Sequence, residues 1–210
     1  ELVVVPKPTP VSGDGAANGG VSFARPQVPD TKLFLEEMVA FYGEVCGLAR
    51  LPEVRLPEVR EGFCWGLIML PGITIEADLT AMKAQYPVFR WTDKNLDEIT
   101  KSVRSADTGP YAVWFRDRVE ADSENASKSA EGLDREGIPG ITLPERIRLE
   151  RWFYWRTDQH LDVKGWTLCS GSRHSGGDVP YVCWCGGKLS VSWCSPRFAH
   201  PSLRARAAVR

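Results

Sequence analysis

The spacing of apolar residues predicts four helices with short apolar strands between them. Between residues 31 and 48, apolar side chains recur three and four positions apart, which is the repeat of an amphipathic helix, and Gly47 is placed to end it. A capping box at residues 142–145 gives the last helix a defined start. Helices are expected at residues 31–48, 74–85, 95–103 and 143–157. Strands are expected at residues 62–70, 89–91 and 111–115.

Two runs near the C-terminus alternate in the manner of strands. Residues 181–185 read Tyr-Val-Cys-Trp-Cys and residues 190–194 read Ser-Val-Ser-Trp-Cys, with a glycine pair between the runs. Alternate residues of a strand point to the same face, so the two runs predict a hairpin with one apolar face. That face carries Val182, Trp184, Val191 and Trp193.

The opposite face of this hairpin has no shared chemistry. It carries Tyr181, Cys183, Cys185, Ser190, Ser192 and Cys194. One aromatic ring, three thiols and two hydroxyls do not share a packing role. We therefore expect this face to lie in solvent, with Cys183, Cys185 and Cys194 more exposed than Cys46 and Cys64.

Four motifs surround the hairpin: Leu-Cys-Ser-Gly-Ser-Arg at 168–173, Pro-x-Val-x-Trp at 180–184, x-Val-x-Trp at 190–193 and Leu-Arg-x-Arg at 203–206. In this order they resemble the variable proteins of diversity-generating retroelements. The resemblance implies an α+β chain with the C-type lectin-like fold, similar to the formylglycine-generating-enzyme subclass, with helices packed on short antiparallel strands. It also implies a binding protein rather than an enzyme. A reverse transcriptase would act on the gene, not on the protein, and would diversify the C-terminal codons at template adenines.

The resemblance assigns the ligand-binding residues to the variable face. Adenine mutagenesis of Asn codons reaches all of their residue types, but it does not reach Trp or Lys, which stand at the positions read as fixed, Trp184, Lys188 and Trp193. The assigned residues are His174, Asp178, Tyr181, Cys183, Cys185, Ser190, Ser192, Cys194, Arg197, Phe198, His200 and Ser202. The expected partner is a variable ligand, a protein or another macromolecule. The Glu-Pro-Asn, Gln-Pro-Asp and Trp-Asn-Asp triplets of calcium-dependent lectins are missing, so neither calcium nor sugar specificity is carried over.

Composition sets the domain organisation. The chain has 210 residues, a formal charge of −1 and 43% hydrophobic residues, which suits one domain at residues 31–210 with a variable region at about 170–209. Residues 1–30 are rich in Pro and Gly and are expected to form a flexible segment. The near-neutral charge argues against nucleic acid as the main partner, and no run of about 18 apolar residues predicts a membrane span.

Six cysteines in a chain of this length favour a reducing compartment, and hence the cytoplasm, over a disulfide scaffold. A zinc site would have to combine Cys183, Cys185 and Cys194 with His174 or His200. In a Cys-x-Cys strand the two side chains stand about 7 Å apart, which is too far to share a small ion unless the strand bends, so no metal and no cofactor are expected. The alternative function is a metal- or thiol-dependent redox enzyme of the formylglycine-generating type that uses these three thiols.

Three further segments are interpreted as loops. The sequence Leu-Pro-Glu-Val-Arg occurs twice, at residues 51–55 and 56–60, and a proline in each copy predicts a surface loop. Residues 123–137 are polar and predict a loop with a helical turn. The mixed charges at residues 116–122 allow an acidic metal site, but an ion-pair network that orders a loop is the favoured interpretation.

Overall fold

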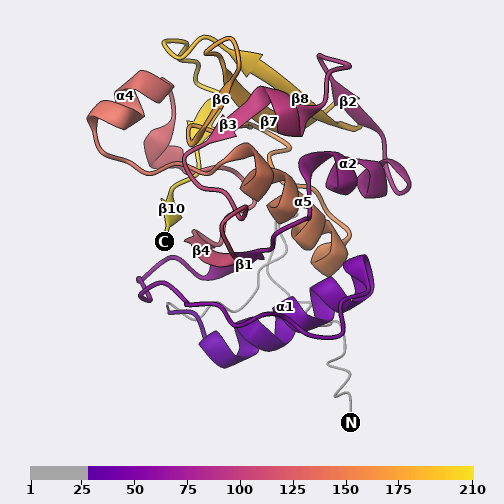
Figure 1. Cartoon of the computed structure of the whole chain (residues 1–210). Coiled ribbons are helices and arrows are strands. Elements are labelled where there is room, and N and C mark those ends of the chain that lie inside the picture. Colours follow the sequence, from indigo (N-terminus) through magenta and orange to yellow (C-terminus); the bar gives the residue numbers. More distant parts are fainter. Residues whose placement is uncertain (1–27) are drawn as a thin grey trace, which may run out of the picture.

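The computed structural model describes residues 28–210, so the flexible segment predicted at residues 1–30 lies almost wholly outside the described residues. The described chain is an α+β protein (Figure 1). Its helices are α1 (Thr31–Cys46), α2 (Ile75–Lys83), α3 (Leu96–Ile99), the 3₁₀ turn η1 (Ser123–Asn125), α4 (Ala130–Arg135) and α5 (Leu143–Thr157). Its strands are β1 (Trp65–Met69), β2 (Val88–Arg90), β3 (Thr100–Ser102), β4 (Tyr111–Phe115), β5 (Trp166–Leu168), β6 (Ser172–His174), β7 (Val179–Cys185), β8 (Lys188–Cys194), β9 (Leu203–Ala205) and β10 (Ala208–Val209). No helix within residues 28–210 is both long and apolar enough to cross a membrane.

Among the described residues the strands form three sheets. One has the order β1-β4-β10, a second the order β2-β8-β7-β5-β9, and β3 pairs with β6. The second, which we call the C-terminal sheet, is mixed, because β2 runs parallel to β8 and β5 runs parallel to β9. The expectation of antiparallel strands throughout was therefore wrong for these two pairs.

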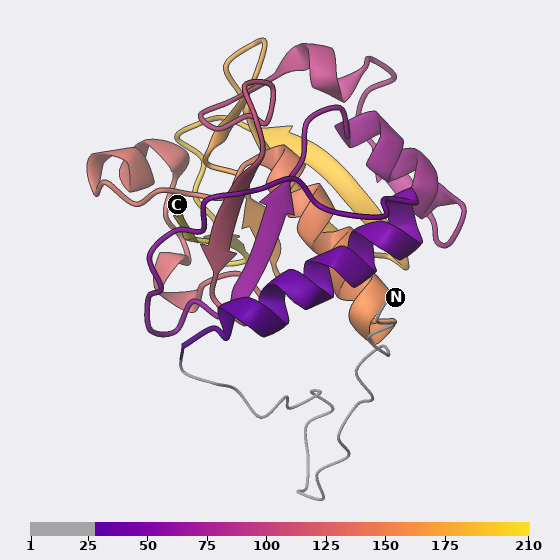
Figure 2. The same ribbon diagram turned by 60° about the horizontal axis from the view of Figure 1, so that its bottom comes forward.

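Helix α5 connects the two larger sheets. Its C-terminal half, through Trp152 and Phe153, packs in one apolar cluster with α1, β1 and β4. Its N-terminal half, through Leu143 and Ile147, packs in another cluster with α2 and the hairpin of β7 and β8. Figure 1 shows α5 between α1 and the C-terminal sheet, and Figure 2 shows α1 lying across β1 and β4. The capping box at Thr142 starts this helix as predicted.

Most predicted elements are confirmed, and one is half wrong. Asp30 caps α1 and Thr74 caps α2, while β1, β2 and β4 lie within a residue or a few of the predicted strands. The helix expected at residues 95–103 ends at Ile99, and β3 follows directly. In the two-stranded sheet, Thr100 of β3 pairs with His174 of β6. A β-branched residue fits that pairing better than a helix interior, and the pairing uses long-range contacts that helical spacing cannot reveal.

The C-terminal hairpin has the predicted faces, and β8 begins at Lys188 rather than at Ser190. Val182 lies opposite Val191, and both are fully buried on the face of the sheet that packs against α5. Trp184 and Trp193 share that face but are only partly buried, at its margins. The turn residues Gly186 and Gly187 have φ values of 59° and 71°, a conformation that a two-residue hairpin turn needs and that glycine adopts without strain.

Candidate binding face

The side of the C-terminal sheet that faces away from α5 holds most of the predicted site. We call it the outer face, and it consists of the residues that alternate with Val182 and Val191. Across the hairpin Tyr181 pairs with Ser192 and Cys183 pairs with Ser190. The antiparallel ladder thus brings these predicted residues together on one surface.

Aromatic side chains lie on the half of the outer face that is nearer to β5 and β9. The ring of Trp166 stacks on Tyr181 with centroids 5.4 Å apart, and on His200 at 5.2 Å. Phe198 lies parallel to His200 at 6.2 Å and is 41% exposed. We call these four residues the aromatic row. Sequence reasoning found three of them but missed Trp166, although its register beside β7 follows once β5 is known.

The opposite margin of the outer face is also aromatic. Phe89 in β2 pairs with Ser190, and the ring of Trp91 meets that of Phe89 at 5.6 Å. Trp91 is 68% exposed, and the Nζ atom of Lys188 lies 4.9 Å from the Phe89 ring centroid. Sequence reasoning assigned no function to Phe89 or Trp91, because their exposure and their place beside Ser190 depend on a strand order that the sequence does not show.

Short side chains occupy the centre, and here the predicted exposure was wrong. Cys183 is 2% exposed, Ser190 is 7% and Ser192 is 8%. They are small residues of β7 and β8, and each of these strands has a neighbouring strand on both sides. Cys185 is exposed and Cys194 is half-buried. Cys46 and Cys64 are also half-buried, so the expected contrast in exposure between the two groups of thiols holds for Cys185 and fails for Cys183 and Cys194.

Part of the outer face is covered by α4. Ala130 and Leu133 of this helix pack with Val179, Leu168 and Leu203 in a small apolar cluster. Tyr181 and Cys194 contact the edge of this cluster. The open part of the outer face therefore begins at Tyr181 and extends toward the turn of the hairpin.

The remaining predicted residues lie around this surface or away from it. Arg197 is exposed and pairs with Glu131 of α4, at 3.1 Å between Nε and Oε1. The backbone N–H of Ser202 donates to Nδ1 of His200. His174 instead contacts Trp193 with ring centroids 4.9 Å apart, on the inner side of the hairpin. These residues were predicted as one variable face, and the structure separates His174 from the rest.

The thiols of Cys183 and Cys185 lie much closer together than a flat strand predicts. Their Sγ atoms are 3.1 Å apart, and Cys185 Sγ lies 3.4 Å from the Ser190 hydroxyl. Burial and the contact with Cys185 raise the pKa of the Cys183 thiol. Burial, with a smaller contribution from Asp178, raises the pKa of Cys194 to about 11. Within residues 28–210, no group of three or more His, Cys, Asp or Glu side chains is arranged to hold a metal ion.

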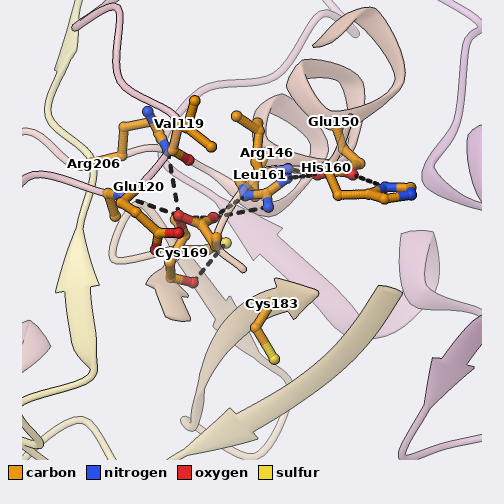
Figure 3. A network of polar contacts seen from close by, with 12 residues as sticks. Val119, Glu120, Arg146, Glu150, His160, Leu161, Cys169, Cys183 and Arg206 are labelled. Atoms are coloured by element: carbon orange, nitrogen blue, oxygen red, sulfur yellow. Dashed lines mark hydrogen bonds and ion pairs between the residues drawn. The ribbon is translucent and has the colours of Figure 1, made fainter. Parts of the chain in front are cut away.

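A buried polar network holds the hairpin from beneath (Figure 3). The carboxylate of Asp162 accepts from Nε of Arg146 at 2.9 Å and from Nη2 of Arg206 at 3.4 Å. Its backbone carbonyl accepts from the N–H of Trp184 at 3.1 Å. His160, bonded to Glu150 at 2.8 Å, stacks on the Trp184 ring. The network fixes the inner side of β7 directly beneath the outer face.

A second ion-pair network orders the segment at residues 116–122. Arg116 donates to the buried carboxylate of Asp122 at 2.7 Å, and Arg118 pairs with Glu124. The same Asp122 accepts from the backbone N–H of Ala207 at 2.8 Å. The favoured interpretation of these charges, a network that orders a loop, is confirmed. It ties this loop to the end of the C-terminal segment.

Comparisons of the chain with protein-family models, with curated proteins and with solved structures found no match. Function is therefore inferred from the residues of the outer face and from the motifs at residues 168–206.

Proposed function

We propose that this chain is a ligand-binding display protein, a variable protein of a diversity-generating retroelement with a C-type lectin-like fold of the formylglycine-generating-enzyme type. The ligand is a protein or another macromolecule, and the outer face contacts it. The motif order at residues 168–206 supports the family, and the α+β architecture is compatible with the fold.

The aromatic row is the observation that carries the binding proposal. Tyr181, Trp166, His200 and Phe198 present a continuous series of rings at the surface. Aromatic residues bury large areas with few rotatable bonds, which is why they dominate binding hot spots. Five strands at their usual spacing make the sheet about 19 Å across, which is wide enough to engage a macromolecule.

A pair of display libraries tests this proposal. The first randomises four outer-face positions, Tyr181, Cys185, Phe198 and His200. The matched control randomises four exposed positions on α1, namely Lys32, Leu33, Leu35 and Val39. Selection against a panel of purified, unrelated globular proteins should yield binders from the first library only. Equal yields from both libraries would contradict a dedicated binding face.

The gene provides the test of diversification. A second, non-coding copy of its 3′ end should lie beside a reverse transcriptase gene. The two copies should differ almost only where the template has adenine. Differences spread evenly over the four bases would contradict the retroelement assignment. They would not affect the binding face, which the display libraries test separately.

One observation favours the second candidate function, a thiol-dependent redox enzyme: the 3.1 Å approach of Cys183 and Cys185. Burial, however, raises the pKa of Cys183 and of Cys194, which keeps both thiols protonated, whereas catalysis requires a thiolate. Metal analysis of protein purified without added metal separates the two functions. Stoichiometric copper or zinc would favour the enzyme.

A further inference from the structure

Two thiols on the outer face are placed for chemistry with each other. Cys183 and Cys185 lie two positions apart on β7 with their sulfur atoms 3.1 Å apart. Cys185 is exposed, whereas Cys183 is 2% exposed. One sulfur is therefore open to a reagent from solvent, and the other is reached only through the first.

We propose that Cys183 and Cys185 form a reversible redox modification site, oxidised to an intramolecular disulfide by low-molecular-weight disulfides such as glutathione disulfide. The two thiols lie on the outer face, but their reaction with each other does not require that this face bind a ligand.

The reaction proceeds by two exchanges. The thiolate of Cys185 attacks one sulfur of glutathione disulfide, which forms a mixed disulfide and releases one glutathione thiolate. Cys183 then gives its proton to a glutathione thiolate and attacks the Cys185 sulfur, which breaks the mixed disulfide and releases the second glutathione. The second glutathione leaves as a thiolate and takes up the proton that Cys185 lost to water, so two protein thiols and one glutathione disulfide become one protein disulfide and two glutathione thiols.

Exposure and protonation assign the two roles. Only Cys185 can be approached by a tripeptide disulfide, because Cys183 lies at the shielded centre of the outer face. The raised pKa of Cys183, caused by burial and by its contact with Cys185, disfavours it as the first nucleophile. Cys185 is therefore the attacking thiol and Cys183 the resolving thiol.

The position of the pair in the hairpin lets the bond form and also makes it labile. A disulfide brings its two Cβ atoms to about 3.8 Å, whereas alternate Cβ atoms of a flat strand stand about 7 Å apart. Bond formation therefore bends the end of β7. The pair of Cys185 with Lys188 is the last of the ladder before the turn at Gly186 and Gly187, so the bend loosens only this end. A disulfide that forces the strand to bend is strained, and a strained disulfide is readily reduced. The modification is therefore reversible.

Cys194 provides an internal control. It pairs with Val179 at the other end of the ladder, six residues along β7 from Cys185, which corresponds to about 20 Å. It therefore cannot resolve a mixed disulfide on Cys185. Trypsin should cut after Arg173, Lys188 and Arg197, which places Cys183 and Cys185 in one peptide and Cys194 in another.

The experiment equilibrates the full chain in mixtures of reduced and oxidised glutathione, quenches with an alkylating reagent and measures the tryptic peptides by mass spectrometry. The parent peptide 174–188 should lose two hydrogens and carry no glutathione. Cys183→Ser should accumulate one glutathione on Cys185, because the resolving thiol is gone. Cys185→Ser should leave Cys183 reduced, and Cys194→Ser should behave as the parent. Thermal melts would first establish that the serine variants are folded.

Three results would overturn the proposal. The first is a parent protein that accumulates glutathione on Cys185 without closing the internal bond, and the second is a parent that stays reduced in glutathione disulfide alone. The third is a Cys183 thiol that reacts as fast in Cys185→Ser as Cys185 does in the parent. Should Cys183→Ser fail to fold, the parent and Cys185→Ser still decide the question, because they differ only at the exposed sulfur.

Discussion

Replacing Asp162 by Asn should destabilise the scaffold beneath the outer face more than its small change in size suggests. The Asp162 side chain is fully buried, and the groups around its carboxylate donate hydrogen bonds to it. Arg146 donates at 2.9 Å through Nε, the N–H of Ala121 donates at 2.9 Å, and the Thr167 hydroxyl donates to the same oxygen as Arg146. An amide has one acceptor oxygen, so either orientation of the introduced Asn side chain would place an NH₂ group against donors.

The substitution also removes one negative charge from between two buried cations. Arg146 and Arg206 are both fully buried, and Asp162 contacts both of them, whereas of these two cations Glu150 contacts Arg146 alone. Breaking a buried ion pair by removing one partner typically costs about 3–5 kcal/mol. For a domain of this size that corresponds to a fall in Tm of about 6–20 °C.

Thermal and urea melts of Asp162→Asn measure this effect. The control is Glu131→Gln, which breaks the exposed pair with Arg197 and should change stability by no more than about 0.5 kcal/mol. Adding Arg206→Met to Asp162→Asn removes one uncompensated cation, so the double variant should be more stable than the sum of the single effects predicts. A cost for Asp162→Asn below about 1 kcal/mol, or strictly additive effects, would refute the reasoning.

Two other predictions follow from local conformation and charge. Gly187→Ala places an L residue at a φ of 71°, and Gly186→Ala at 59°, so each should lower stability by about 1–2 kcal/mol in urea melts. Burial raises the pKa of Glu37, against the lowering effects of Arg156 and Trp152. A raised carboxyl pKa favours the folded state at low pH and loses that contribution as pH rises through the folded pKa. Glu37→Gln should therefore gain stability relative to the parent as pH rises from below 4.5 to 7, and a constant difference across that range in melts would contradict the shift.

The elements that sequence predicts well are those with local signals. The cap at Thr142, the glycine that ends α1 and the alternation in the hairpin depend on neighbours within a few residues. The second half of the helix predicted at residues 95–103 failed because β6 pairs with β3 from about 70 residues away. Contacts of that kind leave no local pattern.

The buried charges of α5 were also beyond sequence reasoning. Arg146, Arg148 and Glu150 would ordinarily lie on the solvent face of a helix, yet all three are buried. Arg148 bonds Asp78 of α2 at 2.7 Å, and Arg146 bonds Asp162, which lies outside any helix. The partners come from separate parts of the chain, so the pattern of charges along α5 alone could not identify them.

In the candidate site, too, the local features were predictable from the sequence and the non-local ones were not. Alternation in β7 and β8 predicted which residues share the outer face, because parity is local. Exposure is not local, since it depends on which strands lie on either side. Cys183 and Ser190 are buried in strands that have neighbours on both sides, and the sequence does not show this order of strands. For the same reason Phe89 and Trp91, distant in sequence, were missed as part of the surface.

Alternate residues of β7 point to opposite faces of the sheet. Those on the inner face are held by contacts with the scaffold, whereas those on the outer face differ in how freely they can be substituted. The N–H of Trp184 bonds the carbonyl of Asp162, and its ring lies on His160, so its position is fixed from below. Cys185, one residue further along, points outward and is exposed. A side chain that varies at Cys185 leaves the contacts of Trp184 intact, whereas one that enlarges the shielded Cys183 must displace neighbours on the sheet. The outer face can therefore accept new side chains most freely at the exposed residues Cys185, Phe198 and His200, and least freely at its centre.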